Sequence, residues 1–165
     1  HKTPEGLHKD IYAFQLLGKI LSEGKSSRFY KSIIDSGLAT SLFMYDFPFK
    51  DNGLFITYAF LTPETNPQAV EDIILNEYKK IVDKGVSAEE LSRAKAQTRA
   101  SVAFSRDGSY SVASSLNEAI AIGDWTFYTT FMDCINKVTI KDLTDVVKKY
   151  LVEDKSTIGW FVPKK

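Results

Sequence analysis

The spacing of apolar residues changes twice along the chain, and these changes restrict the fold more than any other feature of the sequence. Residues 10–35 place apolar side chains three and four positions apart, as on one face of a helix. Between residues 40 and 62 the spacing becomes two, and from residue 67 it is helical again. Helical segments on both sides of a short β segment predict an α+β domain, with helices layered on a small mixed or antiparallel sheet.

Capping signals predict where the helices begin and end. Asp10 is expected to cap a helix over 10–21, and a second, short helix over 27–35 is expected to end at Gly37. Five further helices are expected: one from Pro67 to Gly85, one from the capping box Ser87–Glu90 to a break near Asp107, one over 109–122 ending at Gly123, one capped by Asp124, and one after a looser capping box, Thr139–Asp142.

Alternating residues predict a β-hairpin between the helices. The segment 40–49 carries an aromatic residue at every second position from Phe43 to Phe49, and the segment 54–62 is apolar on both sides. The intervening "KDNG" is a turn signal, so the two strands are expected to pair antiparallel. Because the second strand is apolar on both faces, we expect it to lie inside the sheet.

The last segment, "STIGWFVP", is predicted to be a third strand that returns to the same sheet and stops at Pro163. Three strands would shield seven helices poorly, so the sheet is expected to lack one or two strands at its N-terminal side. We therefore interpret residues 1–165 as a single domain that is a fragment of a longer multi-domain protein.

Charge and cysteine content exclude some classes of partner. The chain has 21 basic and 21 acidic residues, so it lacks the positive excess that nucleic acids and anionic membranes attract. No apolar run approaches the ~18 residues of a membrane span. The lone cysteine, Cys134, permits no internal disulfide and is expected to be a small buried apolar residue. The compartment stays open between a bacterial cell envelope or periplasm and the cytoplasm.

The stretch "GKILSEGKSSRFY" contains the Gly-Lys-Ser that ends a phosphate-binding P-loop. That motif needs a glycine five positions before Gly24, where this chain has Lys19. A P-loop also follows a buried strand, whereas the preceding residues are helical by their spacing. The sequence instead predicts a corner between two helices, with a serine capping the second.

The sequence contains no pattern typical of a catalytic zinc site or of a catalytic serine. A catalytic zinc helix spaces its histidines four apart, whereas His1 and His8 are seven apart, across a proline and a glycine. No Gly-x-Ser-x-Gly elbow occurs. The paired carboxylates Glu89 and Glu90 are explained by the capping box. We therefore expect no metal site, no cofactor and no catalytic residue in this chain.

One long segment, "KDIYAFQLLGKILSEGKSSRFYKSIIDSGLA", resembles the opening of the second, non-catalytic domain of the pitrilysin/insulinase-like zinc peptidases, which include the mitochondrial processing peptidase. Three later segments, "NGLFITYAFLTPETNPQAVEDII", "GVSAEELSRAKAQ" and "INKVTIKDLTDVVKKYL", resemble the same domain in the same order. "TIGWFVPKK" is similar to its closing strand, so the resemblance extends from Thr3 to Pro163.

The resemblance implies a metallohydrolase (LuxS/processing-peptidase)-like domain without its N-terminal strands. Such a domain carries no metal and faces a zinc-bearing domain, with the motif His-x-x-Glu-His, across a chamber that encloses peptides. The implied partners are that N-terminal zinc-bearing domain or subunit and a peptide substrate, and the open sheet edge favours a homodimer of the fragment. Zinc is expected on the other domain.

Two alternatives remain at this point. The domain could belong to a catalytically inactive paralogue that acts as a partner or scaffold subunit, or it could be an unrelated α+β binding domain. Many family members place an arginine and a tyrosine of this domain near the zinc, but no arginine lies between Arg28 and Arg93. The resemblance therefore transfers no catalytic residue.

The resemblance does imply a substrate-binding loop. Its residues would be Gly24, Ser26, Ser27 and Arg28, because processing-peptidase-like members have a glycine-rich loop at this position. The alternative for this loop is structural: Arg28 would pair with a nearby acid, and Ser26 or Ser27 would cap the following helix.

Overall fold

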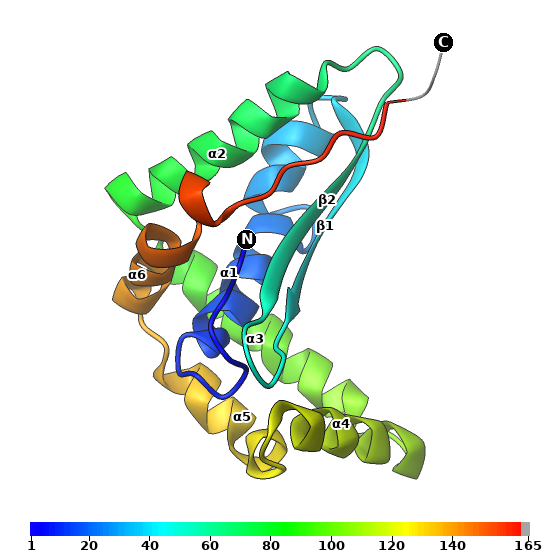
Figure 1. Cartoon of the computed structure of the whole chain (residues 1–165), viewed down its shortest axis with the longest axis vertical. Helices are drawn as coiled ribbons and strands as arrows, with labels where there is room; N and C mark the ends of the chain where they lie inside the picture. The colour runs from blue at the N-terminus through cyan, green and yellow to red at the C-terminus, as the bar shows by residue number, and fades with distance from the viewer. Residues whose placement is uncertain (163–165) are drawn as a thin grey trace.

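The computed structural model describes residues 1–162 and has the predicted order of two helical segments, a hairpin and five helices (Figure 1). The elements are α1 (Ile11–Ser22), the π-helical segment η1 (Tyr30–Ile34), β1 (Ala39–Phe47), β2 (Leu54–Leu61), α2 (Pro67–Lys84), α3 (Ala88–Ser105), α4 (Ser109–Ile122), α5 (Thr126–Lys137), α6 (Ile140–Tyr150) and the 3₁₀ turn η2 (Glu153–Lys155).

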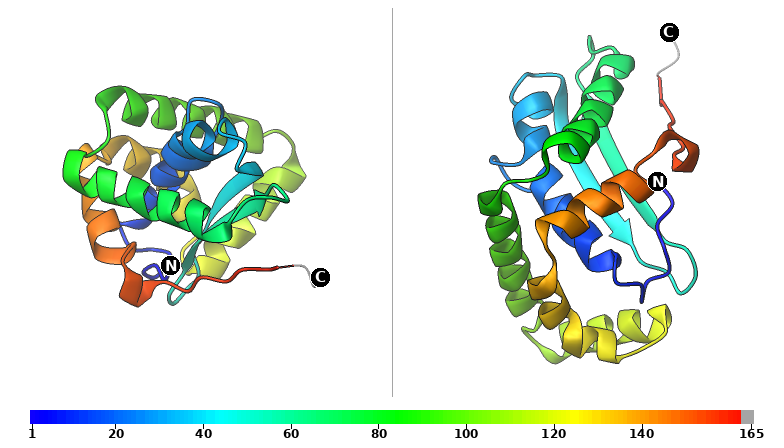
Figure 2. Two further views of the ribbon diagram at one scale, coloured as in Figure 1. Left: turned by 90° about the horizontal axis from the view of Figure 1, so that it is seen from above. Right: turned by 90° about the vertical axis from the view of Figure 1, so that its left-hand side faces the viewer.

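The hairpin pairs antiparallel, as predicted, with Phe43 opposite Tyr58 and Phe47 opposite Leu54. Its inner face packs on α1, where the ring centroids of Phe14 and Phe55 lie 5.1 Å apart and both side chains are buried. Helices α3, α5 and α6 pack against α1, and α2 packs against α6 and η1, so the core lies between the hairpin and the helices (Figure 2). An α+β domain with a two-stranded antiparallel sheet is therefore confirmed.

Most helix boundaries follow the predicted capping signals. Asn66 caps α2 by accepting from the Gln68 N–H, and both capping boxes close, at Ser87 and at Thr139. Asp10 is one exception, because its side chain makes no cap hydrogen bond. The Asp10 carboxylate accepts instead from the Tyr150 hydroxyl at 2.9 Å, which ties the start of α1 to the end of α6.

Helix α3 extends beyond the core, as its polar composition predicts. Only Ala94 and Thr98 are buried along it. Near the connection to α4, Phe104 and Tyr110 are almost fully exposed. Figure 1 shows α4 and α5 forming an arm below the hairpin.

Three further predictions, on strands and on burial, are wrong within residues 1–162. The segment 156–162 is extended but forms no strand, and Pro163 lies outside the described residues. Strand β2 is not interior, since its ladder is with β1 and its other edge carries only an isolated bridge from Leu54 to Lys2. Cys134 is partly exposed rather than buried, because α5 lies on the outer arm.

Over the same described residues, no helix combines the length and the apolar character needed to cross a lipid bilayer.

Candidate functional site

The loop between α1 and η1 contains the four predicted substrate-binding residues. Gly24 has a φ of 79°, a conformation that favours glycine, and it turns the chain after α1. The buried Ser27 donates its hydroxyl to the Gly24 carbonyl at 2.7 Å. Gly24 and Ser26 are exposed. The loop is thus closed on itself by Ser27 and presents Gly24 and Ser26 to solvent.

No serine side chain caps η1, so the predicted serine cap is wrong. The Ser27 hydroxyl is oriented back toward the loop rather than forward to the helix, because the preceding carbonyl of Gly24 is its acceptor.

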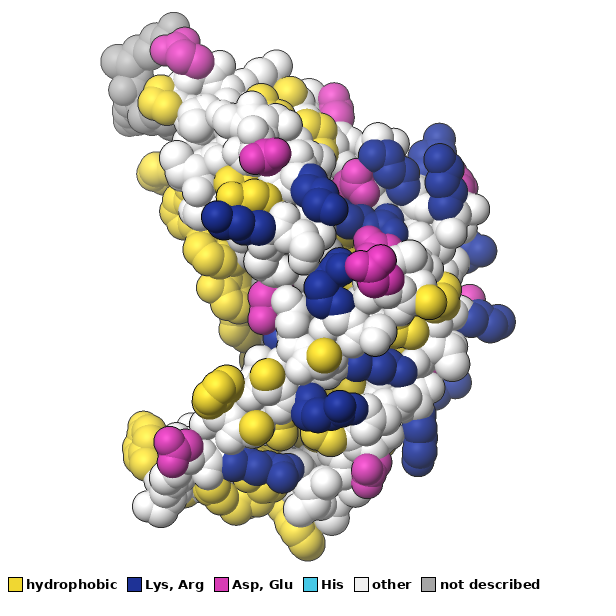
Figure 3. Space-filling view, turned by 180° about the vertical axis from the view of Figure 1, so that it is seen from behind, with side chains coloured by type: hydrophobic (Ala, Val, Ile, Leu, Met, Phe, Trp, Pro, Cys, Tyr) yellow, Lys and Arg dark blue, Asp and Glu magenta, His cyan; other side chains and the backbone are white. Residues whose placement is uncertain are grey.

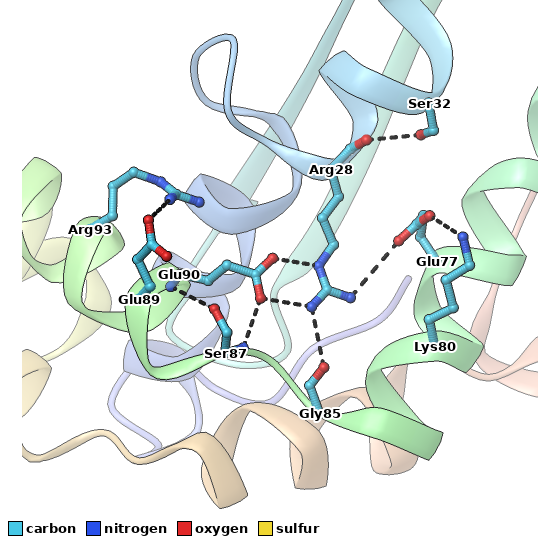
Figure 4. Close-up of polar contacts among 9 residues, drawn as sticks. All are labelled: Arg28, Ser32, Glu77, Lys80, Gly85, Ser87, Glu89, Glu90 and Arg93. Carbon is cyan, nitrogen blue, oxygen red and sulfur yellow. Dashed lines mark hydrogen bonds and ion pairs between the residues drawn. The ribbon is translucent and has the colours of Figure 1, made fainter.

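Arg28 points away from the loop tip and joins three segments (Figure 4). Its Nε and Nη2 donate to the two carboxylate oxygens of Glu90 at 2.7 and 2.8 Å, and Nη2 also donates to the Gly85 carbonyl at 3.2 Å. Its Nη1 lies 3.8 Å from the carboxylate of Glu77 on α2. Pairing of Arg28 with a nearby acid, the structural alternative for this residue, is confirmed.

The electrostatics of this cluster follow from the bidentate geometry. The hydrogen bonds from Arg28, aided by those from the backbone and hydroxyl of Ser87, lower the pKa of Glu90 to about 2. The same hydrogen bonds and the charge of Glu90 raise the pKa of Arg28. Glu90 therefore serves both as the capping-box acid of α3 and as the anchor for Arg28.

A hollow of about 200 Å³ lies beside the loop. It is bounded by the end of α1, by η1 and by the first residues of β1: Ser22, Phe29, Tyr30, Ile34, Thr40, Ser41 and Leu42. A second hollow, of about 340 Å³, lies over the Arg28 cluster, but its charged groups already bind one another. The first hollow differs from the second in that no charged side chain lines it.

The outer face of the hairpin is a row of half-exposed aromatic side chains. The row consists of Phe43, Tyr45, Phe47, Phe49, Tyr58 and Phe60, which are 39 to 58% exposed. Successive ring centroids along the first strand lie 5.9 to 6.3 Å apart, and Tyr45 contacts Tyr58 across the strands at 6.2 Å. Figure 3 shows apolar side chains along a concave margin between the hairpin and α4. This aromatic face is an exposed apolar surface on the strands.

The sequence pattern places Phe43, Tyr45, Phe47 and Phe49 on one side of the first strand, but it does not show that this side is exposed. It also missed Asp46, on the inner face of β1. One carboxylate oxygen of Asp46 accepts from the Gln15 side chain at 3.0 Å, and the other is buried without a partner. Burial raises the pKa of Asp46 to about 7, against the smaller effect of the Gln15 hydrogen bond.

Metal-binding side chains do not cluster within residues 1–162: no group of three or more His, Cys, Asp or Glu could hold an ion. His8 lies 3.5 Å from Asp10, and the ring of His1 packs edge-on to Tyr78. The two histidines are thus engaged on different parts of the structure.

Comparison with known proteins identifies relatives that extend over nearly the whole chain. Zinc protease PqqE of Helicobacter pylori is 24% identical over 164 residues, which are 99% of this chain and 37% of that protein. The β subunit of the mitochondrial processing peptidase of Saccharomyces cerevisiae is 28% identical over 111 residues, 66% of this chain and 24% of the subunit. The matches therefore span 24 to 37% of the length of these curated relatives.

A solved structure has the same fold. The inactive peptidase domain of a putative zinc protease from Bordetella parapertussis superposes with a TM-score of 0.89 at 24% identity, covering 100% of this chain and 88% of that one. Residues 2–98 match the family described as the peptidase M16 inactive domain. That match takes in the hairpin, the loop and Arg28 with its partners. The chain belongs to the peptidase M16 inactive-domain family.

Proposed function

We propose that this domain forms one wall of a peptide-enclosing chamber in a zinc metallopeptidase. A separate, N-terminal domain or subunit holds the zinc and activates the water that attacks the peptide bond. This domain contributes binding surface and no reacting group. The single observation that carries the proposal is the aromatic face, which lies along the concave margin of the molecule.

The chemistry of the aromatic face suits an unfolded peptide. Aromatic rings contact apolar side chains and peptide groups with little dependence on sequence, because they offer a large rigid surface. The hydroxyls of Tyr45 and Tyr58 add hydrogen-bonding capacity without charge. A chamber that accepts many peptides needs such a surface, and a stably monomeric protein seldom exposes one.

The loop 24–28 is the second part of the proposal. We assign peptide contact to the exposed Gly24 and Ser26, next to the hollow beneath β1. Ser27 and Arg28 hold the loop in place through their own hydrogen bonds. The loop would thus contact substrate at its tip, while its base is fixed to α3.

Peptide cleavage by the full-length parent protein tests the aromatic face. Tyr45→Thr and Tyr58→Thr keep good strand formers but remove rings, and each is expected to lower kcat/KM roughly fivefold, mainly through KM. Leu75→Ala, at an exposed apolar position of α2, is the matched control and should leave kcat/KM unchanged. Unchanged cleavage in both tyrosine variants would remove the face from the peptide path.

A separate pair of variants tests whether the loop 24–28 contacts peptide. Ser26→Trp places bulk at the loop tip and should raise KM, whereas Ser36→Trp places the same bulk at an exposed turn after η1 and should not. Equal KM values for the two variants would contradict peptide contact by the loop. If the zinc-bearing part of the parent lacks His-x-x-Glu-His, the domain serves instead as a scaffold in an inactive paralogue.

A further inference from the structure

The carboxyl group of Asp46 lies beneath the aromatic face, near the end of β1. Its neighbours Tyr45 and Phe47 are 47 and 39% exposed on the outer face, whereas Asp46 lies on the inner face toward α1. Its Oδ2 accepts from the Gln15 side chain at 3.0 Å, and its Oδ1 is buried without a partner. The residue opposite it on β2 is the buried Phe55. Within residues 1–162, one neutral amide is therefore the only hydrogen-bond donor to this carboxyl group.

Among the described residues, the elements that pack against β1 place no unpaired cation beside Asp46. These elements are β2, α1 and η1, and their titratable side chains are Tyr58, Tyr12, Lys19, Tyr30 and Lys31. The three tyrosines carry no positive charge in either protonation state. Lys19 already binds Glu23, at 2.6 Å. Lys31 belongs to η1, which lies beside the other end of β1, around Thr40.

The N-terminal segment adds a positive charge on the far side of β2. The amino group of His1 donates to the Phe55 carbonyl at 2.9 Å, at the edge of β2 that faces away from β1. An ionised Asp46 in its present position is thus a negative charge held out of water without a positive partner among the described residues. Such a charge is unfavourable because nothing compensates its loss of hydration. The carboxyl group must therefore be neutral or must leave this position.

We propose that protonation of Asp46 decides whether the end of β1 stays packed on α1. With its proton, the carboxyl group stays on Gln15. Once ionised, it moves into water and draws residues 45–49 off α1, together with the aromatic side chains that they carry. The described sheet has two strands, so the end of β1 moves without displacing a further strand. The hairpin thus contains a pH-dependent switch beneath the aromatic face.

The pH at which the switch operates follows from burial. Burial raises the pKa of Asp46 from an ordinary 3.8 to about 7, against the smaller effect of the Gln15 hydrogen bond. The packed arrangement is therefore fully favoured below pH 3.8 and is lost as the pH rises through about 7. The switch acts on the conformation of the hairpin, whether or not the aromatic face contacts peptide.

Two backbone amides report on the two ends of the hairpin. The Gly6 N–H donates to the Phe49 carbonyl at 2.7 Å, so it loses its acceptor when residues 45–49 move. The Thr62 N–H donates to the Leu38 carbonyl at 3.1 Å, at the other end of the hairpin. A movement confined to the end of β1 therefore exposes the first amide and leaves the second protected.

Amide hydrogen exchange compares these amides at pH 5 and pH 8, after correction for the intrinsic exchange rate. Three forms of the 165-residue chain are measured: the unsubstituted chain, Asp46→Asn and Asp51→Asn. Asparagine at position 46 stays neutral at both pH values. Asp51 is exposed in the turn of the same hairpin, so Asp51→Asn is the matched control. A carbon-13 NMR titration of the Asp46 carboxyl group measures its ionisation directly.

Between pH 5 and pH 8, the protection of Gly6 should fall at least about tenfold in the unsubstituted chain and in Asp51→Asn, while that of Thr62 does not change. Asp46→Asn should keep both amides protected, and the carboxyl titration should give a pKa of about 7. Equal protection of Gly6 at the two pH values, a loss that persists in Asp46→Asn, or a carboxyl pKa below about 5 overturns the proposal. An equal loss at Thr62 also overturns it, because the whole hairpin rather than its end then opens.

Discussion

Arg28 is the residue on which three segments depend. Its guanidinium is mostly covered and binds Glu90, the Gly85 carbonyl and, at longer range, Glu77. Removing one member of such a group leaves an opposite charge and a carbonyl without their partner.

Arg28→Ala is therefore expected to lower the free energy of unfolding by about 2–3 kcal/mol. Urea denaturation measures it, and Lys141→Ala, which breaks the exposed pair with Asp145, is the control expected to show no change. An equal free energy of unfolding for Arg28→Ala and the unsubstituted chain would show that the Arg28 cluster makes no net contribution to stability.

The Arg28 cluster also predicts a dependence on acid. Since Arg28 lowers the pKa of Glu90 in the folded chain to about 2 from an ordinary 4.5, Glu90 stabilises the fold above pH 4.5. This stabilisation is lost as the pH falls from 4.5 to 2. The melting temperature of Glu90→Gln should fall less steeply between pH 4.5 and pH 2 than that of the unsubstituted chain. A slope as steep as that of the unsubstituted chain would contradict the assignment.

Asp46 predicts the opposite dependence. Its pKa is raised by burial to about 7 from an ordinary 3.8, so the folded state favours the protonated form. Stability is full below pH 3.8 and declines as the pH rises from 3.8 to 7. Asp46→Asn should match the unsubstituted chain at pH 4 and exceed it at pH 8 in thermal melts. Lower stability of the asparagine variant at pH 8 would show that the carboxylate has a partner.

At the scale of elements, the turn of the hairpin is fixed by Gly53. A Cβ there would lie 2.5 Å from the Phe47 carbonyl and 2.6 Å from the Thr3 hydroxyl. The first of these atoms is backbone and can move only if the strand pair moves.

Gly53→Ala should therefore destabilise the chain by roughly 1–3 kcal/mol, whereas Gly159→Ala, with nothing within 4 Å of its added Cβ, should not. Thermal unfolding followed by circular dichroism compares the two. A melting temperature for Gly53→Ala no lower than that of Gly159→Ala would contradict the close packing at the turn.

Elements with local signals at both ends could be predicted from sequence. Helix α4 begins after Gly108 and ends before Gly123, and its predicted bounds hold. The tail 156–162 could not be predicted, because a strand needs a partner and the described residues supply none. The pairing of Arg28 with Glu90 joins residues 62 positions apart and leaves no periodic trace in the sequence. Likewise, the alternation of apolar and polar residues in β1 does not show that the Asp46 carboxylate is buried.

At the scale of the whole molecule, the aromatic face is the surface for which we propose peptide contact. Figure 3 shows apolar side chains along the concave margin between the hairpin and α4, which places this surface on one side of the molecule. We propose that the domain acts together with a separate zinc-bearing domain or subunit.

Zinc analysis of the purified chain checks this division. The histidines are engaged separately and no ligand cluster occurs within residues 1–162, so we expect zinc well below one ion per chain. Stoichiometric zinc that survives dialysis against a weak chelator would contradict the assignment of the metal to the other domain.

The most direct test of the proposed chamber is peptide cleavage by the zinc-bearing part of the parent protein, measured with and without residues 1–165. We predict that neither part cleaves an unfolded peptide efficiently alone and that the two together do. We also predict that Tyr45→Thr weakens the reconstituted activity while Leu75→Ala does not. Full cleavage by the zinc-bearing part alone would contradict the proposed chamber.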